Sequence, residues 1–286
     1  MSQLAVGLLD GISFGVILFL ISSGLSLIFG TAGILNFAHG ALYMIGSYVG
    51  WLFAVKIGLN FWLAVILGGL AGGFLGLVLE RGFFRYLYKM PDEQVLLSIS
   101  FVYIMVNLCQ WVFGPVPKPP FAAPSLSGHF TIMGRWYPVY RLALILIGIV
   151  LALGLWWLQE KTRAGAIVRA GMEDKEMTVG LGINYGLVAT AVFFLGCFMA
   201  GFAGVLGSGL IGPNLDLGWD TLLWAIIVLV IGGMGSVQGA LVGAILIGLI
   251  DYFGKALFPE FAMFTIYVAM IAILLVRPSG LLGRRF

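Results

Sequence analysis

The chain has 286 residues, of which 61% are hydrophobic and 9% are charged, and its mean hydropathy is +1.10. These values lie outside the range of soluble domains and within that of proteins that cross the membrane several times. The formal net charge of +3 is a small excess and gives no indication of a nucleic-acid partner. Because each crossing takes about 20 apolar residues, little of the chain is left over for a soluble catalytic domain.

Eight apolar runs predict an all-α polytopic membrane protein with about eight transmembrane segments and re-entrant or broken helices, in a single domain over residues 1–286. The first run contains Asp10 and lacks a basic region or an evident cleavage site, so we expect a retained helix. Six prolines between Gly114 and Pro138 predict a structured, non-helical loop. The apolar runs lie at residues 4–29, 33–55, 61–79, 94–113, 138–158, 186–209, 221–250 and 261–276.

The basic residues indicate an orientation, because Lys and Arg collect on the cytoplasmic side of membrane proteins. Ten of them fall in the segments 81–89, 161–175 and 277–285, which we therefore place in the cytoplasm. The other five would be external, namely Lys56, Lys118, Arg135, Arg141 and Lys255. Eight of the 27 charged side chains lie between Glu160 and Glu176, so residues 160–184 are predicted to form a long cytoplasmic loop.

Glycines interrupt the long apolar run 221–250 at Gly232, Gly233 and Gly235, which Ser236 follows. About 11 and 14 apolar residues remain on the two sides. A helix that ends inside the membrane is tolerated where its backbone is buried in protein or faces a watery cavity. We expect this segment to enter and return on the external side. The break either serves packing or lines a translocation path. It is not a phosphate-binding loop, because no Lys-Ser or Lys-Thr pair follows the glycines.

A second break is expected at residues 30–40, where Asn36, Phe37, His39 and Gly40 lie within an apolar stretch. Polar groups there either form hydrogen bonds between helices or contact a passing solute. Two such breaks in corresponding places predict repeat halves at residues 1–89 and 186–286. Glycines four residues apart, at Gly68, Gly72 and Gly76 and at Gly239 and Gly243, predict close helix packing.

The sequence does not indicate an enzyme. With two histidines in the chain, no nucleophile, base and orienting group can be assembled, and no metal-ligand spacing is present. Apart from His39, no ionisable residue lies clearly in the middle of an apolar run, so ion coupling is not indicated. Transport would then need a separate motor, and the charged loop 160–184 is the part that such a partner could bind.

Four stretches together resemble the permease subunits of branched-chain amino-acid ABC importers, a family that includes relatives for urea and amides. They are GLSLIFGTAGILNFAHGALYMIGSY at 24–48, RAGMEDKEMTVGLGIN at 169–184, IGGMGSVQGALVGA at 231–244 and LLVRPSGLLG at 274–283. The resemblance implies a multi-pass protein of the bacterial inner membrane that works with a second related permease, two cytoplasmic ATPases and a periplasmic or extracellular solute-binding protein. It also implies that this chain binds no cofactor, while ATP and Mg²⁺ are used by the ATPases.

In this family the segment that resembles 169–184 includes a coupling helix that docks on the ATPase. The docking candidates here are Arg169, Ala170, Glu173, Asp174, Gly180, Leu181, Gly182 and Ile183. The residues Met177, Thr178 and Val179, where relatives often carry a small residue, depart from the family pattern and leave the solute open. We expect a branched-chain amino acid or a similar small polar solute. A urea or short-amide importer is one alternative, and a self-contained secondary transporter or channel is another.

Overall fold

The computed structural model describes residues 2–88, 90–132 and 134–283. Six of its helices are long and apolar enough to cross a membrane, and three of the shorter ones lie within the bundle beside them. The six are α1 (Ser2–Ala32), α3 (Phe61–Gly82), α4 (Pro91–Phe113), α5 (Val139–Lys161), α8 (Tyr185–Gly207) and α10 (Val237–Leu257). The shorter helices are α2 (His39–Trp51), which continues as a π-helical turn at Leu52–Lys56, α9 (Leu217–Gly232) and α11 (Ala262–Val276). The chain is therefore an all-α polytopic bundle, as the sequence predicts. The predicted count of about eight crossings is not confirmed, because six of the described helices have the length of a full span.

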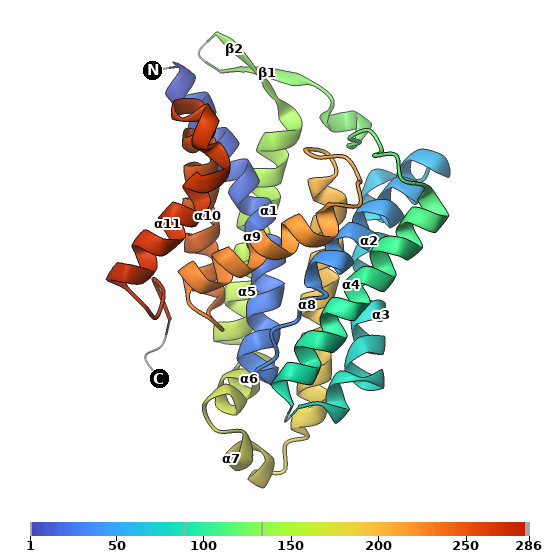
Figure 1. Cartoon of the computed structure of the whole chain (residues 1–286), viewed down its shortest axis with the longest axis vertical. Coiled ribbons are helices and arrows are strands. Elements are labelled where there is room, and N and C mark those ends of the chain that lie inside the picture. The colour runs from blue at the N-terminus through green and yellow to red at the C-terminus, as the bar shows by residue number, and fades with distance from the viewer. Residues whose placement is uncertain (1, 89, 133, 284–286) are drawn as a thin grey trace.

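The bundle has two distinct ends (Figure 1). One carries the N-terminus and a small antiparallel hairpin of β1 (His129–Ile132) and β2 (Arg135–Pro138), and we call it the hairpin end. The other carries α6 (Arg163–Glu173) and α7 (Lys175–Gly180), and we call it the α6–α7 end.

An ion pair joins the N-terminal helix to the start of α5. Arg141, in the first turn of α5, pairs with Asp10 of α1, so the N-terminus shares its end of the bundle with the Pro-rich loop. That loop is non-helical as predicted, apart from a 3₁₀ turn at Pro124–Leu126. Of the basic residues that indicate the orientation, Lys89, Arg284 and Arg285 lie outside the described residues.

Glycines allow the central helices to approach closely, as their spacing predicts. A Cβ atom at Gly24 of α1 would strike the carbonyl oxygen of Gly196 in α8. A Cβ at Gly72 of α3 would lie 2.6 Å from the carbonyl oxygen of Cys197, again in α8. Gly248 of α10 meets the backbone of α1 in the same way. Backbone-to-backbone contact of this kind is how helices associate when lipid supplies no hydrophobic driving force between them.

The three helices that precede α4 in the chain, α1–α3, pack in a way that matches the three that follow α7, α8–α10. α1 packs along α10 and α8 packs along α3, while α2 lies on α8 and α9 lies on α1. The corresponding helices α1 and α8 run in opposite directions, since α1 runs towards the α6–α7 end and α8 runs away from it (Figure 1). α1–α3 and α8–α10 thus form two groups of helices with matching contacts.

The predicted break in 221–250 is present, since α9 ends at Gly232 and α10 begins at Val237. The segment before α9 is held to the Pro-rich loop, where the amide of Lys118 donates to the carbonyl of Pro213 (2.8 Å). α9 then runs obliquely across the middle of the bundle, and α10 runs to the hairpin end (Figure 1). One expectation is wrong. The second arm is not a 14-residue half-helix, because α10 has 21 residues and could cross a membrane.

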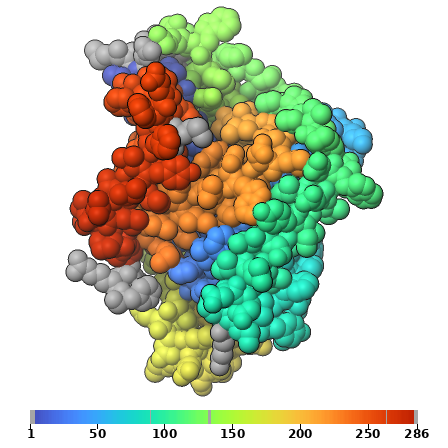
Figure 2. All heavy atoms as spheres, viewed as in Figure 1, coloured from blue at the N-terminus to red at the C-terminus, as the bar shows by residue number. Residues whose placement is uncertain are grey.

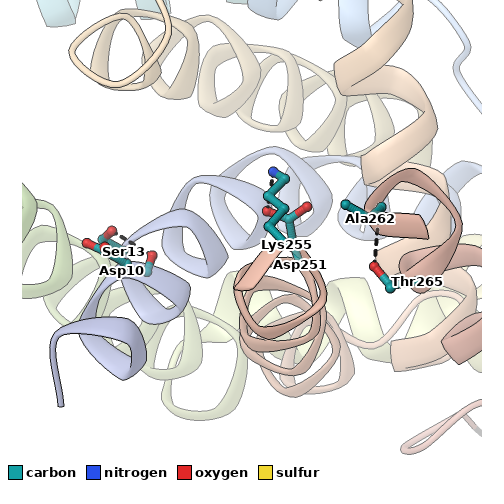
Figure 3. Close-up of polar contacts among 6 residues, drawn as sticks. All are labelled: Asp10, Ser13, Asp251, Lys255, Ala262 and Thr265. Atoms are coloured by element: carbon teal, nitrogen blue, oxygen red, sulfur yellow. Dashed lines mark hydrogen bonds and ion pairs between the residues drawn. The ribbon is translucent and has the colours of Figure 1, made fainter. Parts of the chain in front are cut away.

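The extra length of α10 is explained by the way it accommodates charge near its end (Figure 3). Asp251 pairs with Lys255 one helical turn later, with 2.6 Å between Nζ and Oδ2. In the neighbouring helices, the hydroxyls of Ser13 and Thr265 donate to the carbonyls of Asp10 (2.9 Å) and Ala262 (2.8 Å). Because these polar groups find partners one turn away, none of them ends its helix.

Candidate functional site

Residues 33–38 separate α1 from α2 as a non-helical, largely buried segment that ends in a turn. Gly33 has φ of +68°, a conformation that favours glycine and ends α1. The side chain of Asn36 is fully buried, and its Oδ1 accepts a hydrogen bond from the amide of Ala38 (3.1 Å). Its Nδ2 lies 4.0 Å from Sγ of Cys197 in α8. Asn36 therefore supports its own turn and contacts α8.

His39 and Gly40 join the start of α2 to two other helices. Nε2 of His39 lies 2.9 Å from the carbonyl oxygen of Ile21 in the middle of α1. Because a carbonyl only accepts, Nε2 carries the hydrogen and the imidazole is the neutral Nε2–H tautomer or the cation. Gly40 lies against the backbone of Gly218 at the start of α9. Asn36, His39 and Gly40 are buried within this one chain, and Phe37 is half-buried.

The break between α9 and α10 is also closed by contacts within the chain. The amides of Leu281 and Leu282 donate to the carbonyls of Ile231 (2.8 Å) and Gly232 (3.0 Å), which the end of α9 leaves without helical partners. Gly233 and Gly235 have φ of +102° and +81°. Oγ of Ser236 then accepts from the amide of Gly239 (2.9 Å) and begins α10.

The segment 160–184 forms two short helices outside the bundle. Oγ1 of Thr162 accepts from the amide of Gly165 (3.1 Å) to begin α6, and Oδ1 of Asp174 accepts from the amide of Met177 (2.8 Å) to begin α7. Arg169 pairs with Glu160 at 3.7 Å, which ties α6 back to α5. Two of the docking candidates, Arg169 and Ile183, are half-buried. The other six are exposed, namely Ala170, Glu173, Asp174, Gly180, Leu181 and Gly182.

α7 and the turn after it present apolar side chains to solvent. Met177 is 68% exposed, Val179 51% and Leu181 75%. Exposed apolar groups in a charged segment outside the bundle are typical of an interaction site. Of these three residues, only Leu181 is among the docking candidates predicted from the sequence.

A buried carboxylate lies next to α7, and sequence reasoning missed it. Glu80 of α3 is 3% exposed. Its Oε1 accepts from the hydroxyl of Tyr88 (2.8 Å), and its Oε2 accepts from the hydroxyl of Thr190 in α8 (2.9 Å). The available signal was an acidic residue directly after an apolar run, because a carboxylate at the end of a membrane helix is costly to bury unless it is satisfied.

Lys175 connects this carboxylate to α7. Its Nζ lies 5.3 Å from the ring centre of Tyr88 and 5.5 Å from that of Tyr185, within the range of cation–π attraction. The hydroxyl of Tyr185 donates to the carbonyl of Thr31 at the end of α1 (2.8 Å). We call Glu80, Tyr88, Lys175, Tyr185 and Thr190 the Glu80 cluster.

The Glu80 cluster lines a cavity of about 430 Å³ at the α6–α7 end. Burial, followed by the hydrogen bond to Glu80, raises the pKa of Tyr88 above its ordinary value, so the phenol stays protonated and donating. The cluster thus joins α7 to α1, α3 and α8 through side chains with defined partners.

Comparison with known proteins agrees with this architecture. The family described as "Branched-chain amino acid transport system / permease component" matches residues 7–274. The chain is 29% identical to the high-affinity branched-chain amino acid transport system permease protein LivH of Escherichia coli K12, with 96% of this chain and 94% of that protein covered. It is 28% identical to the corresponding BraD protein of Pseudomonas aeruginosa, with 97% and 95% covered.

The fold is also found among solved structures. The structure described as PsaBC from Streptococcus pneumoniae in complex with Fab matches 93% of this chain and 89% of that chain, with a TM-score of 0.52 and 11% identity. At that identity the likeness concerns the fold alone. With the family matching nearly the whole length, the chain belongs to the permease components of branched-chain amino acid transport systems.

Proposed function

We propose that this chain is the membrane permease subunit of an ATP-driven ABC importer that moves branched-chain amino acids across the bacterial inner membrane. The observation that carries the proposal is the similarity to LivH over 96% of the chain. In this proposal the chain is not itself an enzyme and binds no cofactor. A second permease, two cytoplasmic ATPases that use ATP and Mg²⁺, and an external solute-binding protein complete the importer.

The α6–α7 segment is the proposed docking site for an ATPase. Its apolar side chains at Met177, Val179 and Leu181 are exposed, and the exposed carboxylate of Asp174 caps α7. The Glu80 cluster would pass a displacement of α7 to α1, α3 and α8, because these helices share its hydrogen bonds and ring contacts. Motion imposed by ATP hydrolysis would then reach the bundle.

The two helix breaks complete the proposal. Residues 1–89 and 186–286 are proposed to be inverted repeat halves, which the matching helix contacts and the opposite directions of α1 and α8 support. The breaks at Asn36–Gly40 and Gly232–Ser236 would border the path as hinge points, since each ends a helix inside the bundle.

Transport tests this function directly. The whole importer is purified through a tag on this chain and reconstituted into liposomes with ATP inside. We expect uptake of labelled leucine, inhibited by isoleucine and valine and not by urea or acetamide. Competition by urea or acetamide in place of the amino acids would favour the amide importer. Uptake by liposomes that contain this chain alone would favour the secondary transporter and overturn the proposal.

Docking is tested by Leu181→Asp, which places a carboxylate beside the exposed apolar side chains of Met177 and Val179. Because the side chain is 75% exposed, folding should be unaffected. We expect the affinity for the ATPase subunits to fall by at least about tenfold, or 1.4 kcal/mol of binding free energy, so that they are lost from the purified complex. Leu146→Ala, on the exposed side of α5, serves as a control that should keep the ATPases. Retention of the ATPases by Leu181→Asp would contradict docking at α7.

A further inference from the structure

Beyond its first turn, α4 carries four exposed hydroxyl or amide side chains, at positions where a lipid-facing helix carries apolar ones. They are Ser100, Tyr103, Asn107 and Gln110. Their spacing of three, four and three residues places them within an arc of roughly 80° on the helix. The stripe is about 15 Å long and begins nine residues into a helix that meets the criteria for a membrane span. We call these residues the α4 stripe.

The α4 stripe points away from the molecule. The buried side chains of α4 are Gln94, Ser98, Val102 and Cys109, which cluster on roughly the opposite face. The phenol of Tyr103 and the amide of Gln110 have no hydrogen-bond partner within the described part of the chain. Ser100 and Asn107 donate only to their own helix, to the carbonyls of Leu96 and Tyr103 (2.8 Å each).

α5 shows what a lipid-facing helix of this protein looks like. It has the same length of 23 residues and is equally exposed, yet it carries no hydroxyl, amide or charged side chain from Leu142 to Leu158. Its exposed side chains include Leu146, Val150 and Trp157. α4 therefore differs from α5 in carrying polar side chains on its exposed face.

Polar side chains inside a membrane face a protein interior or a watery cavity, because hydrocarbon leaves their hydrogen bonds unmade. We propose that the α4 stripe lines a water-filled translocation path, closed on its other side by a second permease subunit. The inference rests on the proposed function and names the surface along which the solute passes.

The surroundings of the stripe fit this assignment. Tyr103 packs against Trp219 of α9, with 5.2 Å between the ring centres, so the surface continues onto α9. Figure 2 shows α4 and α9 adjacent on one face of the molecule. From Gln94 to Phe113 α4 carries no charged side chain. Uncharged hydroxyl and amide groups suit a solute with hydrogen-bonding groups and no net charge, such as a zwitterion.

Cysteine accessibility in the assembled importer tests the proposal. Ser100→Cys and Asn107→Cys are made in the full complex, and membranes are treated with a membrane-impermeant, cationic thiosulfonate. Leu108→Cys on the apolar side of α4 and Val150→Cys on α5 are the matched controls, both exposed in the single chain. The two native cysteines are buried and set the background.

We expect the stripe cysteines to react at least about tenfold faster than the controls, because thiols react as thiolates and these form in water rather than in lipid. Leucine with the binding protein and ATP should slow the reaction at the stripe alone. Equal, slow reaction at all four positions would overturn the proposal. The proposal would also fail if a stripe cysteine did not react with the thiosulfonate but could be cross-linked to the partner permease, because the stripe would then be a dry contact between the two subunits. Leucine uptake by the unmodified complex is measured alongside, and its absence would reject the proposed function instead.

Discussion

The hydroxyl of Thr190 donates a hydrogen bond of 2.9 Å to Oε2 of Glu80, and this contact joins α8 to α3 next to α7. Glu80 is 3% exposed, and its other oxygen is occupied by Tyr88. A carboxylate this deeply buried is stabilising only while both oxygens have donors. The contact therefore couples two central helices to the docking segment and depends on each partner.

Replacing Glu80 with alanine should destabilise the protein by on the order of 2 kcal/mol, because the hydroxyls of Tyr88 and Thr190 lose the charged acceptor that ties them to α3. Glu80→Gln keeps one oxygen acceptor and should cost less. Thermal unfolding of the purified complex in detergent measures both. If the two variants unfold at the unmodified temperature, Glu80 does not hold α3 and α8 together.

The stability of the complex should fall as the pH rises above about 10, partly through Tyr88. Its pKa is raised in the folded state by burial and by the hydrogen bond to Glu80, so the stabilisation is present below the unfolded pKa and is lost above it. Unfolding temperatures measured from pH 8 to 11 test this. Tyr88→Phe should show a shallower decline than the unmodified protein, and an identical decline would contradict the assignment.

Gly24→Ala should destabilise the bundle by ~1–3 kcal/mol, because its Cβ would meet the carbonyl oxygen of Gly196 and separate α1 from α8. Gly154→Ala in α5 is the matched control, since nothing lies within 4 Å of its Cβ position. The control should unfold at the same temperature or slightly higher. Unfolding in detergent compares the two, and equal losses would show that close approach at Gly24 is unimportant.

Ser236→Ala removes the side chain that accepts from the amide of Gly239 and should cost about 1 kcal/mol of stability. Ser236→Thr keeps the hydroxyl cap and should retain that stability. Leucine uptake by the threonine variant separates the two readings of this break. A changed KM for leucine at unchanged stability would place Ser236 on the path, whereas unchanged transport would assign it to packing.

The sequence predicts much of this architecture because membrane helices are specified locally. Long apolar runs, glycine pairs and prolines mark the spans, the break at residues 232–236 and the non-helical loop before α5. The length of α10 was underestimated because a charge at residue 251 looks like a helix end until its partner Lys255 is seen one turn later.

The sequence by itself determined the class of protein, the positions of most helices and, through its motifs, the family. Only the tertiary structure decided which polar residues face inwards: it buries Asn36 and His39 within one chain and leaves the α4 stripe outside. It also brought Glu80 and Thr190 together from positions 110 residues apart. The physical reason is that hydrophobicity acts residue by residue along the chain, whereas the partner of a polar group depends on how the helices pack.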